Sequence, residues 1–275
     1  MMQSAKDTEW LISFYKELEV RLTKCERTVS IIIQGPLNKR SISTIPEYLK
    51  RGEVIVSCWG NDDLSLLDEY KKDIKIIANK HSEIGRFRSR PGSASPWVYQ
   101  NYTTRNGLLA AKSFFSIKVR SDESYPNLDP LIKMLIKQNE ERDPETGEFE
   151  NRIITSNIYF RKDRDKKFHP SDHIIAGRTP RMIDIFSLSV IEAARLAGDF
   201  PEQIIGQAVI NSKFDKKLGK FEEADPSRSR ELMKKHFNII RVSELPNHTW
   251  TSSYCKYDAL HGDEGTDWCN SINEL

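Results

Sequence analysis

The sequence predicts an α/β protein, a single Rossmann-like domain in which helices flank a mainly parallel central sheet. Strand-like and helix-like segments alternate along the first half of the chain, which is typical of a parallel sheet. The alternating segment 116–123 ends in two adjacent carboxylates, and ligand sites of such sheets collect beyond the carboxyl ends of strands. At 275 residues the chain is long enough to bury a substantial core.

The first strand is expected at 28–37, where an apolar β-branched run is broken by Gly35 and Pro36. Further apolar runs at 54–59 and 74–78 predict the second and third strands of the same sheet. Apolar residues at helical spacing fill the intervals between the strands. The helices expected in this half are 43–51, 64–70, 101–113 and 129–141.

A polar turn at 143–149 is the expected boundary between a first half of the domain, about 28–142, and a second half, about 150–245. It is too short for a linker, so the whole chain, 1–275, is taken as one domain. Beyond the turn, strands and helices continue without an internal repeat. The expected elements are strands at 152–160 and 174–178 and helices at 182–196 and 202–211.

The two ends of the chain carry an amphipathic helix, within 1–27, and a polar tail, 246–275. The helix is expected to pack against the domain, since this is the commonest use of an amphipathic face. Peripheral contact with a membrane that holds a lipid-linked acceptor is the alternative. The tail mixes His, Trp and acidic residues and is expected to be solvated.

Charge and cysteine usage exclude several classes of protein. The chain has 42 basic and 40 acidic residues and a net charge of +2, so nothing indicates binding to nucleic acid. Its four cysteines form no Cys-x-x-Cys pair, and we expect free thiols, with Cys58 in the core. No apolar run reaches membrane-spanning length and no signal peptide is evident, so a cytoplasmic location is expected.

The carboxylates at the end of 116–123, Asp122 and Glu123, form the first candidate site. Hard oxygen ligands of this kind suit Mg²⁺ or Mn²⁺, which substrate phosphates and water then complete. Such an ion would hold the diphosphate of a nucleotide-sugar. The simpler explanation is a polar turn in which Arg120 pairs with one of the two carboxylates.

Several short motifs, taken in order, resemble the WavE family of lipopolysaccharide-synthesis proteins. The similarity runs from about residue 30 to about residue 210 and depends on the order and spacing of the motifs. They are Ile33-Gln34-Gly35-Pro36, the strand end Val56-Ser57-Cys58-Trp59, Thr104-Arg105-Asn106-Gly107-Leu108, Lys118-Val119-Arg120-Ser121-Asp122, Ser171-Asp172-His173-Ile174-Ile175-Ala176-Gly177 and Pro201-Glu202-Gln203.

The resemblance implies a glycosyltransferase with the GT-A arrangement, which uses a nucleotide-sugar donor and a glycan or glycolipid acceptor. Residues 28–142 would then form the donor half of the domain and residues 150–245 the acceptor half. It places Gln34, Gly35 and Pro36 near the nucleoside and gives Asp122 contact with a metal ion or the diphosphate. GT-A enzymes commonly carry Asp-x-Asp, whereas this chain has Arg-Ser-Asp-Glu at 120–123.

Arginine offers another way to bind the diphosphate, since guanidinium groups match phosphate geometry. Arg105 and Arg120 are therefore donor-binding candidates that supplement or replace a metal ion. The loop 86–90, with three arginines, is a further candidate clamp. The simpler explanation for each is a solvated surface charge.

A transfer with inversion needs a carboxylate base that reaches the acceptor hydroxyl. Asp172 is slightly preferred for this role over Glu202, which opens a helix after Pro201. Simpler explanations are a capping turn for Asp172 and a helix-dipole contact for Glu202. His248, near the C-terminus, is a candidate third metal ligand beside Asp122 and Glu123.

Two rival functions remain open at this point. One is a non-catalytic GT-A-like domain that binds a nucleotide or glycan, which the missing second Asp of Asp-x-Asp favours. The other is a different nucleotide-dependent enzyme, and it ranks last because the sequence has no P-loop and no Gly-x-Gly-x-x-Gly.

Overall fold

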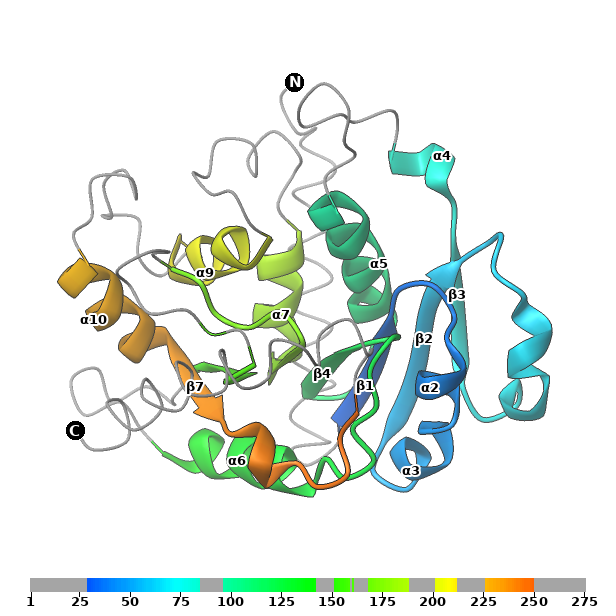
Figure 1. Ribbon diagram of the computed structural model, residues 1–275, viewed down its shortest axis with the longest axis horizontal. Helices are drawn as coiled ribbons and strands as arrows, with labels where there is room; N and C mark the ends of the chain where they lie inside the picture. Colours follow the sequence, from blue (N-terminus) through cyan, green and yellow to red (C-terminus); the bar gives the residue numbers. More distant parts are fainter. Residues whose placement is uncertain are drawn as a thin grey trace.

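The computed structural model describes residues 29–84, 96–141, 151–158, 160, 168–187, 201–211 and 226–249. Its centre is a seven-stranded sheet in the order β3-β2-β1-β4-β6-β5-β7 (Figure 1). The strands are β1 (Val29–Gln34), β2 (Glu53–Trp59), β3 (Lys75–Asn79), β4 (Phe115–Arg120), β5 (Ile153–Ser156), β6 (Ile174–Arg178) and β7 (Phe237–Ile240).

The sheet is mainly parallel, as predicted. β1 pairs in parallel with β2 and β4, β2 with β3, and β5 with β7. Only β6 runs the other way among the described strands, antiparallel to both β4 and β5. The predicted α/β class with a mainly parallel sheet is therefore confirmed, and strands from both predicted halves share one sheet.

Helices lie on both faces of the sheet (Figure 1). Helices α5, α7 and α9 cover one face, and α3 and α6 cover the other. The described helices are α2 (Lys39–Ile42), α3 (Ile45–Leu49), α4 (His81–Ile84), α5 (Pro96–Ala110), α6 (Asp129–Glu140), α7 (Thr179–Phe186), α9 (Pro201–Asn211) and α10 (Pro226–His236), with 3-10 turns η1 (Leu64–Tyr70) and η3 (Val242–Glu244).

The two faces carry separate apolar cores, because successive strand residues point to opposite sides. In β1, Ile31 and Ile33 join the core under α3 and α6, whereas Ile32 joins the core under α5 and α7. All three are at most 2% exposed. A strand buried on both faces reads as a continuous apolar run, which is why β1 was predictable. Cys58 is buried, as expected.

The structure changes several predicted boundaries. Helix α5 begins at Pro96, five residues before the predicted start, because proline is well suited to a first helical turn. The strand predicted at 152–160 is limited to Ile153–Ser156. Helix α10 and strand β7 were not predicted at all.

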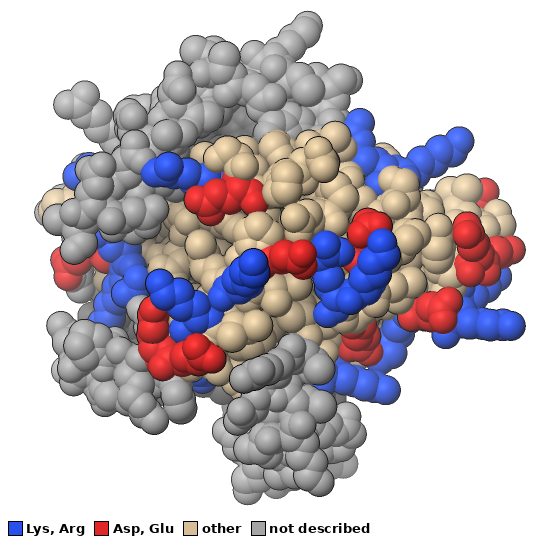
Figure 2. Space-filling model, turned by 90° about the horizontal axis from the view of Figure 1, so that it is seen from below, with Lys and Arg blue, Asp and Glu red and all other residues tan. Residues whose placement is uncertain are grey.

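Other predictions fall outside the described residues. These are the helix within 1–27, the loop 86–90, the boundary turn 143–149, the second part of the helix predicted at 182–196, and the tail from residue 250. The described helices include none long and apolar enough to cross a membrane. On the face seen in Figure 2, the described Lys and Arg side chains lie among Asp and Glu side chains, without a large area of one sign.

Candidate functional site

Strand register brings the candidate residues to one edge of the sheet. Gln34, at the end of β1, pairs with Ser57 of β2 on one side and with Arg120 of β4 on the other. Because β6 is antiparallel to β4, Ile174 at its start lies beside Val119 near the end of β4. The turn that precedes β6 therefore reaches the same edge as the carboxyl ends of the parallel strands.

The turn after β1 depends on Gly35, whose φ is +118°. A Cβ atom there would lie 2.8 Å from Ser121 Oγ, so the turns after β1 and β4 are in close approach. Glycine is the residue that adopts such a φ without strain. Asp62 Oδ2 accepts hydrogen bonds from the backbone N–H groups of Leu37 and Trp59, at 3.1 and 2.9 Å, and so joins the ends of β1 and β2.

A cavity of about 470 Å³ opens at this edge. It lies between the ends of β1, β2 and β4 and the first turns of α4 and α5. Ligand sites of open α/β sheets are found at this position. The residues that line it are Gln34, Pro36, Trp59, His81, Tyr99, Gln100, Arg120 and Asp122.

One wall of the cavity is aromatic. The rings of Trp59 and His81 stack with centroids 3.9 Å apart and an interplanar angle of 12°. Tyr99 meets both rings edge-on, with centroids 5.7 and 5.6 Å away. Trp59 is 5% exposed, so its position is fixed by packing, while His81 is exposed. A stacked wall of this kind suits a planar ligand ring.

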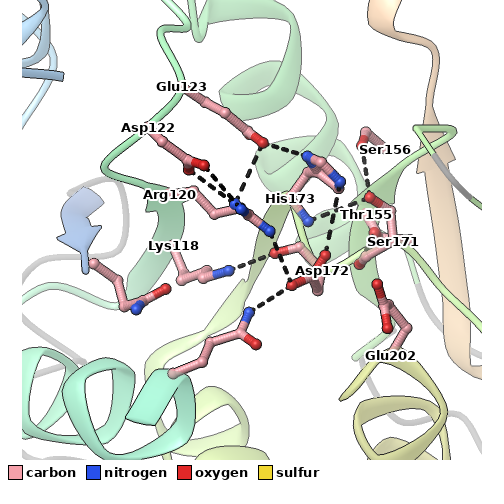
Figure 3. A network of polar contacts seen from close by, with 12 residues as sticks. Lys118, Arg120, Asp122, Glu123, Thr155, Ser156, Ser171, Asp172, His173 and Glu202 are labelled. Atoms are coloured by element: carbon pink, nitrogen blue, oxygen red, sulfur yellow. Dashed lines mark hydrogen bonds and ion pairs between the residues drawn. The ribbon is translucent and has the colours of Figure 1, made fainter. Parts of the chain in front are cut away.

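Another part of the cavity lining is polar and centres on Arg120. Its Nε and Nη2 donate to Asp122 Oδ1 and Oδ2, both at 2.9 Å, which is a bidentate pair. Nε also lies 3.4 Å from Glu123 Oε1, and Nη1 lies 3.6 Å from Asp172 Oδ2 (Figure 3). Burial acts to lower the pKa of Arg120, but the Asp122 hydrogen bonds and neighbouring carboxylates outweigh it and raise the pKa. The guanidinium therefore remains charged.

Behind this wall, Glu123 is fully buried and has two hydrogen-bonding partners besides the ion pair with Arg120. Its Oε2 accepts a hydrogen bond from Tyr125 Oη at 2.6 Å, and its Oε1 pairs with His173 Nδ1. Burial acts to lower the pKa of His173, but the charge of Glu123, its hydrogen bond and the charge of Asp172 together outweigh burial, so the pKa is raised. The buried Glu123 carboxylate thus favours the protonated, positively charged form of the His173 imidazole.

Asp172 lies in the turn before β6 and is held from several sides (Figure 3). Its Oδ2 accepts from Gln100 Nε2 at 2.7 Å, and its backbone carbonyl accepts from Lys118 Nζ. Burial acts to raise the pKa of Asp172, but the positive charges of Arg120, His173 and Lys118 lower it below its ordinary value. The carboxylate is ionised, and it shares Gln100 and Arg120 with the cavity wall.

Lys118 is a fully buried lysine in the middle of β4. Burial lowers its pKa to about 8, an effect that the nearby charge of Asp172 opposes. The sequence motif contained Lys118, but no role was predicted for it. A charged side chain within an otherwise buried strand was the signal for its place in the site.

Glu202 begins α9, near the Asp172 turn (Figure 3). Its Oε2 lies 3.8 Å from His169 Nε2 and accepts no hydrogen bond from the described residues. Burial, followed by the charge of Asp172, raises its pKa to about 7. Gly206 allows this close packing, because a Cβ atom there would lie 2.1 Å from the carbonyl oxygen of Phe168.

The predicted metal ligands do not fit a shared divalent ion as they are arranged. Both oxygens of Asp122 accept from Arg120, and both oxygens of Glu123 are paired. His248 directs Nδ1 to the carbonyl oxygen of Leu245 at 2.9 Å. Within the ranges that the structure describes, no three His, Cys, Asp or Glu residues converge as metal ligands.

The structure thus gathers some predicted site residues and separates others. Gln34, Pro36, Arg120 and Asp122 line the cavity, and Asp172 lies directly behind it. Arg105 is on α5 and is not among the lining residues. His248 comes near the acidic turn because the next residue forms a β-bridge with Ser124. The aromatic wall and Gln100 were missed, although each lies beside a strand end or in a first helical turn.

Comparison with known proteins gives one family and a set of solved structures. The family model for WavE lipopolysaccharide synthesis matches residues 29–219, more than half of the chain. The glycosyltransferase GlyE of Streptococcus pneumoniae TIGR4 is similar with a TM-score of 0.39 and 11% identity, over 90% of this chain and 52% of that one. HddC of Yersinia pseudotuberculosis is similar with a TM-score of 0.36 and 10% identity, over 78% and 90%.

The chain therefore spans about half the length of GlyE, 52% of it. No curated protein matches the sequence.

Proposed function

The chain belongs to the WavE lipopolysaccharide synthesis family, and from this premise we propose that it is a glycosyltransferase. It would move a sugar from a nucleotide-diphospho-sugar to a glycan or lipopolysaccharide-type acceptor. One observation carries the proposal: a single cavity of about 470 Å³ is lined both by stacked aromatic side chains and by Arg120, and the ionised Asp172 contacts Arg120 from behind the lining.

The aromatic wall supports a nucleoside site. The base would stack against His81, whose other neighbour in the stack is Trp59. Stacking on aromatic side chains stabilises base binding by about 1–3 kcal/mol per base. Gln34 and Pro36 also line the cavity and would lie near the nucleoside, as the family resemblance implies.

The donor diphosphate would face Arg120, which is 23% exposed and lines the cavity. Because the residues predicted to hold Mg²⁺ or Mn²⁺ do not fit such an ion as arranged, no step here passes through a metal. Among the described residues that line the cavity, Arg120 is the one Arg or Lys side chain.

We assign the role of catalytic base to Asp172 because its Oδ2 contacts Gln100 and Arg120, which line the cavity. The reacting acceptor hydroxyl would replace the Gln100 amide as the hydrogen-bond donor to Asp172 Oδ2. In a transfer with inversion, the hydroxyl oxygen attacks the anomeric carbon, its proton passes to Asp172, and the bond to the nucleoside diphosphate breaks. The low pKa of Asp172 keeps it ionised at neutral pH, which is the protonation state that a base needs before the transfer.

A transfer assay tests this proposal. Purified protein is incubated with UDP-, GDP-, CMP- and dTDP-sugars and with lipopolysaccharide-derived oligosaccharides, and nucleotide release and sugar addition are measured by mass spectrometry. The proposal expects both products from one donor class, with their loss in Asp172→Asn. Release of nucleotide at equal rates in the wild type and Asp172→Asn would contradict the assignment of the base.

A non-catalytic binding domain is the second candidate. The bidentate pair between Arg120 and Asp122 favours this candidate. Both oxygens of Asp122, the carboxylate predicted to contact a metal ion or the diphosphate, accept hydrogen bonds from Arg120 instead. Binding of a nucleotide-sugar without turnover, across all acceptors in the same assay, would support this second candidate.

A further inference from the structure

The turn that carries Asp172 is fixed by strand β5. Ser156 Oγ donates to Ser171 Oγ at 3.1 Å, and Thr155 Oγ1 donates to the backbone carbonyl of Ser171 at 2.7 Å. The backbone N–H of His173 also donates to Ser171 Oγ, at 3.3 Å. The backbone on both sides of Asp172 is therefore held, and the orientation of its carboxylate depends on side-chain partners.

Those partners treat the two carboxylate oxygens differently. Oδ2 accepts from Gln100 at 2.7 Å and lies 3.6 Å from Arg120 Nη1, both of which line the cavity. Oδ1 is buried on the other side, accepts no hydrogen bond from the described residues, and lies 3.8 Å from His173 Nε2. At that distance the contact is an ion pair and not a hydrogen bond.

The ring of His173 is in turn fixed from behind. Its Nδ1 pairs with Glu123 Oε1, and Glu123 Oε2 accepts from Tyr125 Oη at 2.6 Å. Glu123 and Tyr125 are at most 1% exposed, so neither has room to rotate. Contacts thus link Tyr125, Glu123, His173 and Asp172 in a chain from the core to the cavity. Figure 3 shows the last three of these residues.

We propose that His173 is a positioning residue for the sugar transfer, which Glu123 holds so that its Nε2–H orients the Asp172 carboxylate with Oδ2 toward the acceptor hydroxyl. The inference rests on the glycosyl-transfer function proposed above. His173 touches neither donor nor acceptor and acts only through Asp172. Orientation of a reacting group is a large part of enzymatic rate, and a misplacement of about 1 Å costs about 100-fold.

A purely structural role for His173 is the competing explanation. In that case the ring serves to neutralise the buried carboxylate of Glu123, and its contact with Asp172 is incidental. Removing one partner of a buried charge is destabilising because the other charge is left unpaired. The two roles use different nitrogens of the same ring, so they are separable by substitution.

Two amide variants separate the nitrogens. The amide of His173→Asn reaches the place of Nδ1 and keeps the donor to Glu123. The amide of His173→Gln reaches the place of Nε2 and keeps an N–H group directed at Asp172 Oδ1, without the positive charge of the ring. Donor affinity, kcat, the KM for acceptor and the thermal midpoint are measured for both variants and the wild type. The positioning role predicts opposite orders for kcat and stability.

We expect His173→Gln to retain kcat within about tenfold of the wild type and His173→Asn to lose about 100-fold, with donor affinity unchanged in both. We expect His173→Gln to have the lower thermal midpoint of the two variants, since the buried Glu123 carboxylate loses the side-chain donor at the place of Nδ1. Equal kcat values, or a higher kcat in His173→Asn, would overturn the inference.

Should His173→Gln fail to fold, the double variant Glu123→Gln/His173→Gln removes the unpaired buried carboxylate. It is expected to keep the kcat predicted for His173→Gln, and a fall to the level of His173→Asn would overturn the inference. A wild type that binds donor but transfers no sugar would instead overturn the proposed function, and the positioning role with it.

Discussion

The cavity wall and the network behind it lie at the same edge of one sheet, yet they are built from opposite kinds of side chain. The wall is an open aromatic stack on β2, α4 and α5, with exposed His81 at its surface. The network is closed and charged, with Glu123, Asp172 and His173 each at most 3% exposed. Arg120 connects the two regions, because it lines the cavity and also pairs with Glu123 and Asp172 of the network.

The difference suggests a division of labour. Exposed aromatic side chains contact the ligand directly in the bound complex, so substitutions there should alter binding affinity. Buried charges are costly to maintain, and a site that keeps them uses them in chemistry or orientation. Substitutions in the wall should therefore change donor binding, and substitutions in the network should change kcat and stability.

The largest effect is expected for Asp172→Asn. The amide has nearly the same shape but accepts no proton, and loss of a general base costs about 100- to 10,000-fold in rate. We expect kcat to fall by that amount while donor affinity is kept, as measured by steady-state kinetics and calorimetry. Asp68→Asn, on exposed η1, is the matched control and should behave as wild type. Loss of donor binding in Asp172→Asn would contradict the proposed separation between donor binding at the wall and catalysis in the network.

A smaller effect, on stability, is expected for Glu202→Gln. The folded-state pKa of Glu202 is raised from 4.5 to about 7, so its contribution to stability is fully present below about pH 4.5 and is lost as the pH rises through 7. The variant should match the wild type at pH 4 and exceed it at pH 8, on the order of 2 kcal/mol in unfolding free energy.

Urea unfolding at both pH values measures this difference, with Glu69→Gln on exposed η1 as the control. A variant that is less stable than the wild type at pH 8 would show that the Glu202 carboxylate is stabilised by its surroundings, contrary to the account of the network.

His81→Ala should weaken donor binding by about tenfold, because one aromatic stack contributes about 1–3 kcal/mol. The thermal midpoint and kcat should change little, since His81 is exposed. His81→Phe keeps the stack on Trp59 and should bind as the wild type does. Calorimetric titration with the donor nucleotide compares the three proteins. Unchanged affinity in His81→Ala would show that the nucleotide base does not stack on this wall.

The smallest effect is expected for metal removal. The cation that faces the phosphates in this arrangement is Arg120, which Asp122 holds at 2.9 Å through two hydrogen bonds. EDTA should leave donor affinity within about twofold, and added Mn²⁺ should not increase it. Binding that requires Mn²⁺ would mean that Arg120 releases Asp122 when the donor arrives, and it would restore the predicted metal site.

The sequence was informative where structure is decided locally. The apolar β-branched run of β1 and the apolar segment of β2 predicted buried parallel strands, and the break at Gly35 marked the edge where the cavity opens. The four-residue strand β7 was missed, because so short a segment directly after a helix gives almost no periodic signal.

The site was less predictable because its contacts are set by pairing between distant strands. Nothing local indicates that Asp172 meets Arg120, a contact that follows from the antiparallel register of Val119 with Ile174. The pairing of Arg120 with Asp122, by contrast, was the simpler of two local explanations and is observed. The sequence therefore pointed to several residues that meet at this edge, but the aromatic side chains, Gln100 and the contacts between distant strands came only from the structure.

The most direct test of the whole account is calorimetric titration of the wild type with UDP-, GDP-, CMP- and dTDP-sugars in the presence of EDTA, with Asp172→Asn and His81→Ala alongside. The account predicts that one donor class binds the wild type and Asp172→Asn equally and binds His81→Ala about tenfold more weakly. Binding of none of these donors, with or without Mn²⁺, would contradict the claim that this cavity is the donor site of a glycosyltransferase.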